Sequence, residues 1–384
     1  MSGFPASEFE ARVARAQGLM EAANLDALLL TTEPEVRYFT GYLTRFWESP
    51  TRPWFVIVPV TSAPIAVIPS IGAPLMGQTW VQDIRTWRSP DYEDDGVSLV
   101  ADALRAVVPK SGRIGVPSGL ETHLRLPLNS WYALQAAMDD RKFSDDADIM
   151  RRLRLIKSDA EVDKIATACA IADAAFARVP EIAQVGTPLS QVFRAFQGLC
   201  LQEGADWVSY LAGGAGPGGY GDIIAPATDT PLAKGDVLML DTGVVRDGYF
   251  SDFDRNWSLG PAAPETASAY ARLIEASDTT FADARPGVTA ADLFHVMDGV
   301  LTGGAGGSDA GRYGHGLGMQ LTEWPSLIPD DHTVLEPGMV LTLEPGLSLE
   351  TGKTLVHEEN IVITDSGARY LSTPAPRDIP VIPA

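Results

Sequence analysis

Cysteine, long apolar runs and positive charge are all scarce in this sequence. Its two cysteines, Cys169 and Cys200, are too few for a disulfide framework. Both lie in apolar, helix-like segments, so we interpret them as buried thiols. No stretch approaches the ~20 consecutive apolar residues that a membrane-spanning helix needs, and the first twenty residues lack the basic-then-apolar pattern of a secretion signal. These absences argue against a membrane partner and favour a cytoplasmic protein.

The charge balance is strongly acidic. Lys and Arg together number 29, against 50 Asp and Glu, which gives a formal net charge of −21. A surface of that sign repels phosphate groups, so nucleic acid and anionic membranes are not expected as partners. The hydrophobic content of 45% is that of a globular protein with a sizeable core, and a length of 384 residues suggests two domains.

The pattern of elements changes near residue 150. Before it, short apolar strands (LDALLLT, WFVIVPV, PIAVIPS, GRIGVPS) alternate with helical segments, which predicts an α/β domain. A Ser-x-x-Glu start predicts a first helix over 7–23. After residue 200, longer strands and dense glycine predict an α+β domain with a curved antiparallel sheet flanked by helices. Ser158 is expected to cap a new helix over Glu161. We place the domains at 1–148 and 149–384.

A hairpin in the second half gathers carboxylates. Asp247-Gly248 is a strong turn signal, and a two-residue turn there places Asp241 opposite Asp254 and Gly243 opposite Asp252. Side chains alternate along a strand, so all three carboxylates then share one face. Such a cluster is costly without a cation. The alternative is a solvent-facing acidic side, but the neighbouring apolar residues favour a buried sheet.

Three further residues have the chemistry of metal ligands. His315 lies in GHGLG, Glu344 ends the apolar strand VLTLEPG, and Glu358 precedes another apolar strand in LVHEENIVIT. Each alone has a plain structural alternative: a packed histidine or a solvent-facing glutamate. Together with the hairpin they predict a dinuclear site for Mn²⁺, Fe²⁺, Co²⁺ or Zn²⁺. Two such ions can activate a bridging water and polarise a carbonyl.

These stretches carry a family resemblance. LDTGVVRDGYFSDFDRNW, GHGLG, LTLEPG and HEENIVITDSG resemble the creatinase/prolidase/aminopeptidase P family of pita-bread metallopeptidases, and residues 7 to about 140 resemble its creatinase-type N-terminal domain. The resemblance implies that Asp241 holds one metal, that Asp252 and Glu358 bridge both, and that His315 and Glu344 hold the other. Glu344 is also a catalytic candidate. Glu358 is chosen over Glu359 because it stands where the family's glutamate does.

The sequence departs from the family's peptidases at two histidines. The one expected seven positions after His315 is Thr322, although the Glu-Trp-Pro that follows is kept. The other falls near Ile223 or Ile224. Those imidazoles would hydrogen-bond the substrate carbonyl or the oxyanion, whereas a threonine hydroxyl can bond a carbonyl but cannot be cationic. We take Thr322 as a catalytic candidate and Trp324 as a substrate-binding one.

Asp254 is a further difference, because the family usually has threonine there. An extra acid beside the ligands is a partner to them or a general base, and we name it a catalytic candidate. The alternative of equal weight is a salt bridge to the adjacent Arg255.

An N-terminal loop concentrates arginine and tryptophan. Arg45, Trp47 and Arg52 in TRFWESPTRPW suit recognition of a small anion or a quaternary cation, so we name them substrate-binding candidates. A structural aromatic cluster is the alternative. The resemblance implies a homodimer in which loop 43–54 helps to close the pocket. The glycine run at 213–219 is expected to be a flexible pocket-lining loop.

Three functions remain after these observations. The first is a metal-dependent hydrolase that cleaves a C–N bond in an Xaa-Pro dipeptide or similar small molecule. The second is a family member acting on an osmolyte-like substrate, as creatinase, ectoine hydrolase and dimethylsulfoniopropionate lyase do; kept metal ligands disfavour the ectoine hydrolase type. The third is a non-catalytic binding protein, which five ligands in order also disfavour.

Overall fold

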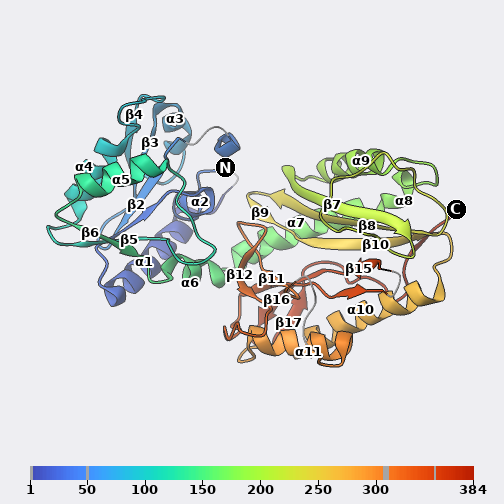
Figure 1. The fold of residues 1–384 in the computed structure, drawn as a ribbon. Coiled ribbons are helices and arrows are strands. Elements are labelled where there is room, and N and C mark those ends of the chain that lie inside the picture. Colours follow the sequence, from blue (N-terminus) through green and yellow to red (C-terminus); the bar gives the residue numbers. More distant parts are fainter. Residues whose placement is uncertain (1–2, 49–51, 306–310, 350–351) are drawn as a thin grey trace. The chain divides into compact units, whose positions relative to one another are not determined.

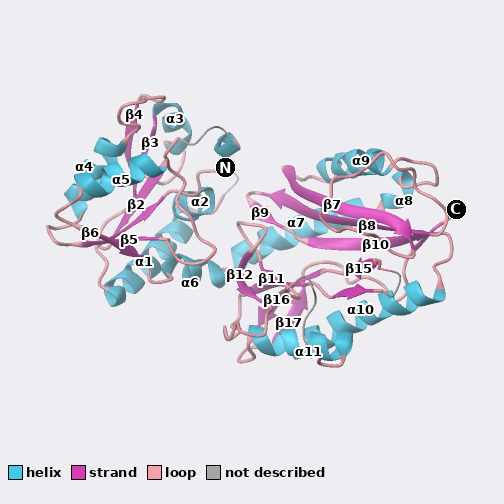
Figure 2. Ribbon diagram, in the orientation of Figure 1, coloured by secondary structure: helices cyan, strands magenta, loops and turns pink. Residues whose placement is uncertain are grey.

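The structure is a computed structural model that describes residues 3–48, 52–305, 311–349 and 352–384. Residues up to Arg154 form one compact unit and those from Leu155 form a second (Figure 1). The first unit is an α/β layer and the second mixes antiparallel sheets with helices, as the change of pattern near residue 150 predicts (Figure 2). No helix in the described part of the chain has the length and apolarity to cross a membrane.

The N-terminal unit is built on a six-stranded sheet of order β4-β3-β2-β1-β5-β6. Its central strands are buried on both faces, because nearly every residue in them is apolar. One face packs against helices α4 and α5. The strands are β1 (Ala27–Leu30), β2 (Phe55–Pro59), β3 (Ile65–Pro69), β4 (Asp83–Trp87), β5 (Arg113–Val116) and β6 (Lys142–Asp145), and the helices are α1 (Ala6–Ala23), α2 (Glu33–Thr40), α3 (Ala73–Met76), α4 (Val97–Val107), α5 (Leu128–Ala137) and α6 (Ile149–Leu155).

The C-terminal unit contains two larger sheets and a short two-stranded one. The first has the order β18-β10-β8-β7 with β9 added to β8, and the second has the order β12-β11-β13-β16-β17. The strands are β7 (Trp207–Pro217), β8 (Asp236–Arg246), β9 (Tyr249–Phe250), β10 (Phe253–Leu259), β11 (His315–Gly316), β12 (Glu323–Ser326), β13 (Val340–Leu343), β14 (Gly346–Ser348), β15 (Thr354–Val356), β16 (Glu359–Thr364), β17 (Gly367–Tyr370) and β18 (Val381–Ile382).

Helices cover the outer sides of these two sheets. Figure 1 shows α9 above the first sheet and α10 and α11 beneath the second. The helix α7 packs on β8 and α9 packs on β7. Their bounds are α7 (Asp159–Ala177), α8 (Val179–Ile182), α9 (Leu189–Gln202), α10 (Pro264–Asp283) and α11 (Ala290–Thr302). The sheets therefore face one another between helices, which is the pita-bread arrangement.

Local sequence signals predict the start of α7 correctly and the capping of α1 incorrectly. Ser158 caps α7, accepting a hydrogen bond from the backbone N–H of Glu161, as expected. The first helix, however, begins at Ala6 behind Pro5 and has no side-chain cap. Ser7 is already inside its first turn, so the predicted capping role of that serine is wrong.

The glycine run at 213–219 is also not the loop that the sequence suggests. Residues up to Pro217 belong to β7, which is hydrogen-bonded along β8. At Gly213, where φ is +150°, a Cβ atom would lie 2.2 Å from the carbonyl oxygen of Met239. Glycine is therefore needed here for close packing of two strands rather than for flexibility.

Candidate metal centre

The hairpin of β8 and β10 forms with the expected register. Asp247 and Gly248 have φ of 51° and 79°, the positive values that a two-residue turn of this kind requires. Asp241 then pairs with Asp254 across the strands. Asp252 lies just before β10, where Asn360 accepts a hydrogen bond from its backbone N–H at 3.0 Å and donates one to its carbonyl oxygen. These bonds fix the backbone that presents the Asp252 carboxylate.

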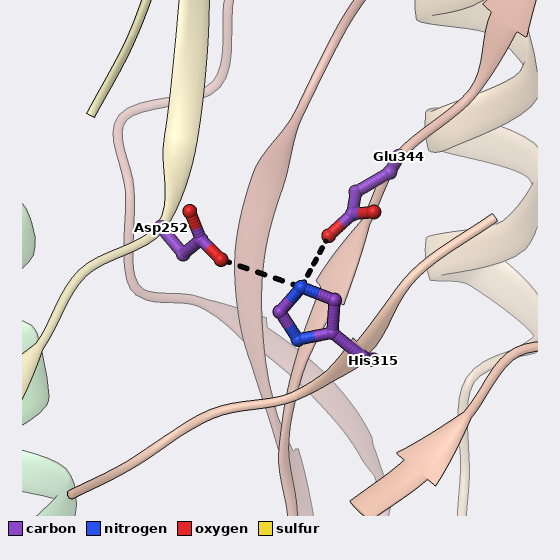
Figure 3. Close-up of side chains that lie close together, drawn as sticks. All are labelled: Asp252, His315 and Glu344. Carbon is purple, nitrogen blue, oxygen red and sulfur yellow. Dashed lines mark ion pairs between the residues drawn. The ribbon is translucent and has the colours of Figure 1, made fainter. Parts of the chain in front are cut away.

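His315 is held between two strands with its ring directed at carboxylates. Its Nε2 lies 2.9 Å from Glu344 Oε1 and 3.3 Å from Asp252 Oδ2 (Figure 3). Its Nδ1 lies 2.8 Å from the carbonyl oxygen of Gly316, which assigns the proton to Nδ1 and leaves Nε2 for a ligand. A Cβ on Gly316 would meet the Trp324 carbonyl oxygen at 1.9 Å, so glycine beside the histidine permits close approach of β12.

The five predicted ligands come together as two overlapping groups. Asp252, His315 and Glu344 form one group, and Asp241, Asp252 and Glu358 form the other, with the ligand atoms in each lying within 4.8 Å of one another. Asp252 belongs to both groups. We call these five residues the carboxylate–imidazole cluster.

Glu358 and its neighbour Glu359 have different surroundings. Glu358 points into the cluster, whereas Glu359 pairs with Arg255 at 3.0 Å and accepts a hydrogen bond from Ser372. Burial alone would raise the pKa of Glu359, but Arg255 and His357 outweigh it and lower that pKa to about 2. Its negative charge is already compensated, so its placement agrees with the choice of Glu358 as the ligand.

The electrostatics of the cluster favour a cation. Burial raises the pKa of Asp241 and Glu358 well above the usual range, and neighbouring carboxylates raise both further. Burial also raises the pKa of Asp252, to about 6. The buried Oδ1 of Asp241 has no hydrogen-bond partner among the described residues. An orphaned oxygen amid mutually repelling acids fits a divalent ion, which would neutralise the acids and bind that oxygen.

The pKa of His315 also indicates that positive charge is stabilised in the cluster. Burial lowers the pKa of its imidazole, but Glu344 and Asp252 outweigh this effect and raise it to about 10. Without a metal, a proton is therefore held among these carboxylates at neutral pH. A divalent ion supplies the same positive charge to the same oxygen and nitrogen atoms, and metal binding would release that proton.

The cluster lies at a pocket of about 290 Å³ in the C-terminal unit. Thr322 lines this pocket, together with both isoleucines at the place of the second family histidine. The remaining lining residues are Tyr210, Met239, Arg312, Leu321, Gly346 and Val356. Sequence reasoning missed Tyr210 and Arg312, because neither residue precedes a recognisable turn or joins a cluster of ligand types. A larger hollow of about 470 Å³ in the N-terminal unit has no carboxylate or imidazole among its described lining residues.

Asp254 does not line the pocket, whereas a general base must lie within reach of the substrate. Its side chain is fully buried, and it accepts hydrogen bonds from the backbone N–H of Glu358 at 2.8 Å and from Asn256 at 3.2 Å. The other possibility, an ion pair between the Asp254 carboxylate and Arg255, is not formed either. The Arg255 guanidinium pairs with Glu359, and it contacts Asp254 at the backbone carbonyl oxygen. Trp324, on β12, is half-buried and is not among the residues that line the pocket.

The arginine and tryptophan residues of the N-terminal loop form a local cluster. Trp47 packs against Trp54 with ring centroids 5.6 Å apart, and the Arg125 guanidinium lies 5.1 Å from the Trp47 ring centroid. Arg45 pairs with Glu48, and Arg52 lies over Phe46 at 5.8 Å. Residues 49–51 of this loop lie outside the described residues. The contacts give the other residues a structural role within their own unit, and the substrate role of Arg45, Trp47 and Arg52 stays a prediction.

A pita-bread unit that carries such a cluster has the architecture of a metallohydrolase. The model of metallopeptidase family M24 matches residues 163–365, and the model of the creatinase/prolidase N-terminal domain matches residues 12–156. The chain therefore belongs to metallopeptidase family M24, which confirms the family, the fold and the class of enzyme that the resemblance implies. Members of such a family use divalent metal ions.

Relatives are similar along almost the whole chain. The crystal structure of dipeptidase PepE from Mycobacterium ulcerans has a TM-score of 0.84 and 28% identity, covering 100% of both chains. An Xaa-Pro dipeptidase of Pyrococcus horikoshii is 26% identical over 361 residues, which cover 92% of this chain and 94% of that protein. A prolidase structure from Thermococcus sibiricus, 22% identical, shares the fold with a TM-score of 0.85 over 97% of this chain and 99% of that one.

Proposed function

We propose that this protein is a metal-dependent dipeptidase that hydrolyses the C–N bond of Xaa-Pro dipeptides or closely similar small substrates. The observation that carries the proposal is the carboxylate–imidazole cluster, in which Asp252 is shared between two groups of ligands at the pocket. The names of the relatives in Mycobacterium ulcerans and Pyrococcus horikoshii support a dipeptide substrate.

The cluster suits two divalent ions, and the five residues divide between them. Asp241 is assigned to one ion, His315 and Glu344 to the other, and Asp252 and Glu358 to both. Bound there, divalent ions polarise a substrate carbonyl and lower the pKa of a water molecule. The donor set of four carboxylates and one imidazole suits Mn²⁺, Co²⁺, Fe²⁺ or Zn²⁺, and manganese is our first choice.

The protein's own groups then orient the substrate and move protons. Glu344 accepts a hydrogen bond from Thr342, which holds its carboxylate beside His315. From there a Glu344 oxygen can accept the proton of an attacking water and pass it to the leaving nitrogen. The Thr322 hydroxyl lines the same pocket and can donate to a substrate carbonyl.

A second candidate function follows from the pocket wall. Thr322, Ile223 and Ile224 stand at the family's two histidine positions, and all three line the pocket. Among the described lining residues, His315 is the only imidazole. A wall of that composition favours a small osmolyte-like substrate over a peptide if the missing imidazoles prove essential.

Turnover of Xaa-Pro dipeptides and tripeptides separates the two functions. Purified protein is loaded in turn with Mn²⁺, Co²⁺, Fe²⁺ and Zn²⁺, its metal content is measured by elemental analysis, and product release is followed. Cleavage by metal-loaded protein, lost in Asp252→Ala, supports the peptidase. No turnover by protein that demonstrably holds metal overturns it and favours the second candidate.

Three finer features belong to the same proposal. A homodimer in which loop 43–54 of one subunit helps to close the pocket of the other would give Arg45, Trp47 and Arg52 their substrate role. Light scattering of the purified protein tests the dimer, and KM values of the three alanine variants test the loop. A cytoplasmic location accords with two unpaired, buried cysteines.

A further inference from the structure

Arg312 stands out among the residues that line the pocket. It is half-buried, and of the described lining residues it alone carries a permanent positive charge. Among the described residues its side chain has one hydrogen bond, a long one from Nη2 to the Thr322 hydroxyl at 3.4 Å. Its guanidinium therefore has most of its donors available to a ligand in the pocket.

The charge of Arg312 reaches the cluster. Arg312 lines the same pocket as His315 and Glu344. The guanidinium therefore lies near the groups that are proposed to hold the metals. A ligand that contacts both Arg312 and the cluster must therefore fit this pocket of about 290 Å³.

Charge balance predicts the sign of the group that Arg312 receives. The cluster contains four carboxylates, whose charge two divalent ions would cancel. Arg312 then leaves the metal-loaded pocket with one uncompensated positive charge. A ligand group with a single negative charge restores neutrality, and a cationic group there would be repelled.

The rest of the lining offers a negative group no equal partner. Leu321, Met239 and Val356 are apolar, as are the two isoleucines. Tyr210 lines the pocket too, but its hydroxyl is uncharged and lies near the Asp241 carboxylate, which repels a negative group. The planar guanidinium fork matches a carboxylate with two parallel hydrogen bonds, and the neighbouring Thr322 hydroxyl can add a third.

We propose that Arg312, assisted by Thr322, binds the free α-carboxylate of the substrate and so restricts the protein to dipeptides. This inference rests on the proposed peptidase function, which supplies a carboxylate one residue from the bond to be cleaved. It assigns Thr322 to carboxylate recognition rather than to the reacting carbonyl. A substrate whose carboxyl end is amidated or extended loses the charge that Arg312 recognises.

Paired substrates test this assignment. The specificity constant kcat/KM is measured for an Xaa-Pro dipeptide and for its C-terminal amide, with metal-loaded wild type, Arg312→Ala and Arg312→Lys. Wild type is expected to prefer the acid, and Arg312→Ala to lose that preference on the order of 10- to 100-fold, chiefly through KM for the acid. Arg312→Lys keeps the charge without the fork and should fall between. Equal use of acid and amide by wild type overturns the proposal.

Two controls separate recognition from other roles of the arginine. Arg369→Ala removes the same charge from an exposed position on β17 and should leave the preference unchanged. Elemental analysis must find equal metal in wild type and Arg312→Ala. Loss of metal in that variant, or an equal fall in kcat for acid and amide, would make Arg312 a counter-charge or an oxyanion donor and overturn the proposal.

Direct binding distinguishes failure of this inference from failure of the peptidase function. L-Proline and L-prolinamide are titrated calorimetrically into the metal-loaded protein. Proline binding that is weakened in Arg312→Ala, with weak prolinamide binding throughout, supports the carboxylate site even if no peptide is cleaved. Absence of proline binding, or binding that is insensitive to Arg312→Ala, overturns it even in an active peptidase.

Discussion

Asp254 Oδ1 accepts a hydrogen bond from the backbone N–H of Glu358 at 2.8 Å. Asp254 lies on β10 and Glu358 directly before β16, far away in the sequence, and the bond fixes the chain at the point where Glu358 enters the cluster. His357 Nδ1 lies 3.5 Å from the same oxygen, and His357 Nε2 lies 3.3 Å from Glu359. Asp254 and His357 thus form a buried pair directly beside a proposed metal ligand and outside the pocket, which suits a positioning role.

Substitution of Asp254 is therefore expected to weaken metal binding more than folding. Asp254→Ala leaves the Glu358 N–H without its acceptor, and we expect a 10- to 100-fold loss of metal affinity, roughly the effect of removing a hydrogen bond that orients a ligand. Asp254→Asn keeps an acceptor and should lose less. Calorimetric Mn²⁺ titration measures both affinities. An unaltered affinity in Asp254→Ala, with an unaltered fold by circular dichroism, would refute the positioning role.

Substitution of Asp241 by asparagine should have opposite effects on stability with and without metal. In chelator, Asp241→Asn removes a buried, repelled carboxylate and is expected to stabilise the protein by about 1–3 kcal/mol. With saturating Mn²⁺ the order reverses, because the variant lacks a ligand and gains less from metal binding. Thermal unfolding in EDTA and in Mn²⁺ measures the crossing. The same order of Tm in both buffers would mean that Asp241 is not a metal ligand.

The sequence predicts those parts of the site that depend on local rules. The Asp247-Gly248 turn sets the register of the hairpin, so the pairing of Asp241 with Asp254 follows from a few adjacent residues. Alternation along a strand does not show which groups a side chain will bind. Asp254 pairs with Asp241 across the hairpin as expected, yet its carboxylate accepts hydrogen bonds from Glu358 and Asn256. Those partners come from packing between the two sheets.

Residues without a local signal were not predictable. Arg312 follows a glycine-rich stretch and enters the pocket only because β11 is held between β12 and β13. The glycine run at 213–219 has the composition of a loop, but the long ladder between β7 and β8 overrides that local preference. Tertiary pairing, which composition does not encode, decides both cases.

The Glu-Trp-Pro segment makes another long-range contact that the sequence does not predict. Lys157 Nζ lies 3.1 Å from Glu323 Oε2, and both side chains are 2% exposed. Lys157→Met would remove the cation beside the buried Glu323 charge, which also accepts hydrogen bonds from the backbone N–H groups of Met319 and Gln320. We expect a loss of about 3–5 kcal/mol in the free energy of unfolding.

The double variant Lys157→Met/Glu323→Gln should recover more than half of that loss, since the neutral amide still accepts both backbone hydrogen bonds. Urea unfolding of the wild type, both single variants and the double variant gives the coupling energy of the pair. Additive effects of the two substitutions would show that the buried contact contributes nothing specific.

Asp146 gives the N-terminal unit a distinct pH dependence. Its carboxylate accepts a hydrogen bond from the backbone N–H of Met150 at 2.9 Å, but burial raises its pKa to about 6 from an ordinary value of 3.8. The folded state therefore holds this proton more tightly than the unfolded state does. The group costs nothing below about pH 4, becomes destabilising as pH rises to about 6, and has a constant cost above.

Asp146→Asn keeps an acceptor for Met150 and removes the charge. It should match wild type at pH 4 and be more stable by about 1–2 kcal/mol at pH 8. Urea unfolding between those pH values measures the difference, and Asp139→Asn, at an exposed position, controls for the change in net charge. An advantage that is the same at pH 4 and pH 8 would show that the substitution acts through packing, because only the ionised carboxylate carries the pH-dependent cost.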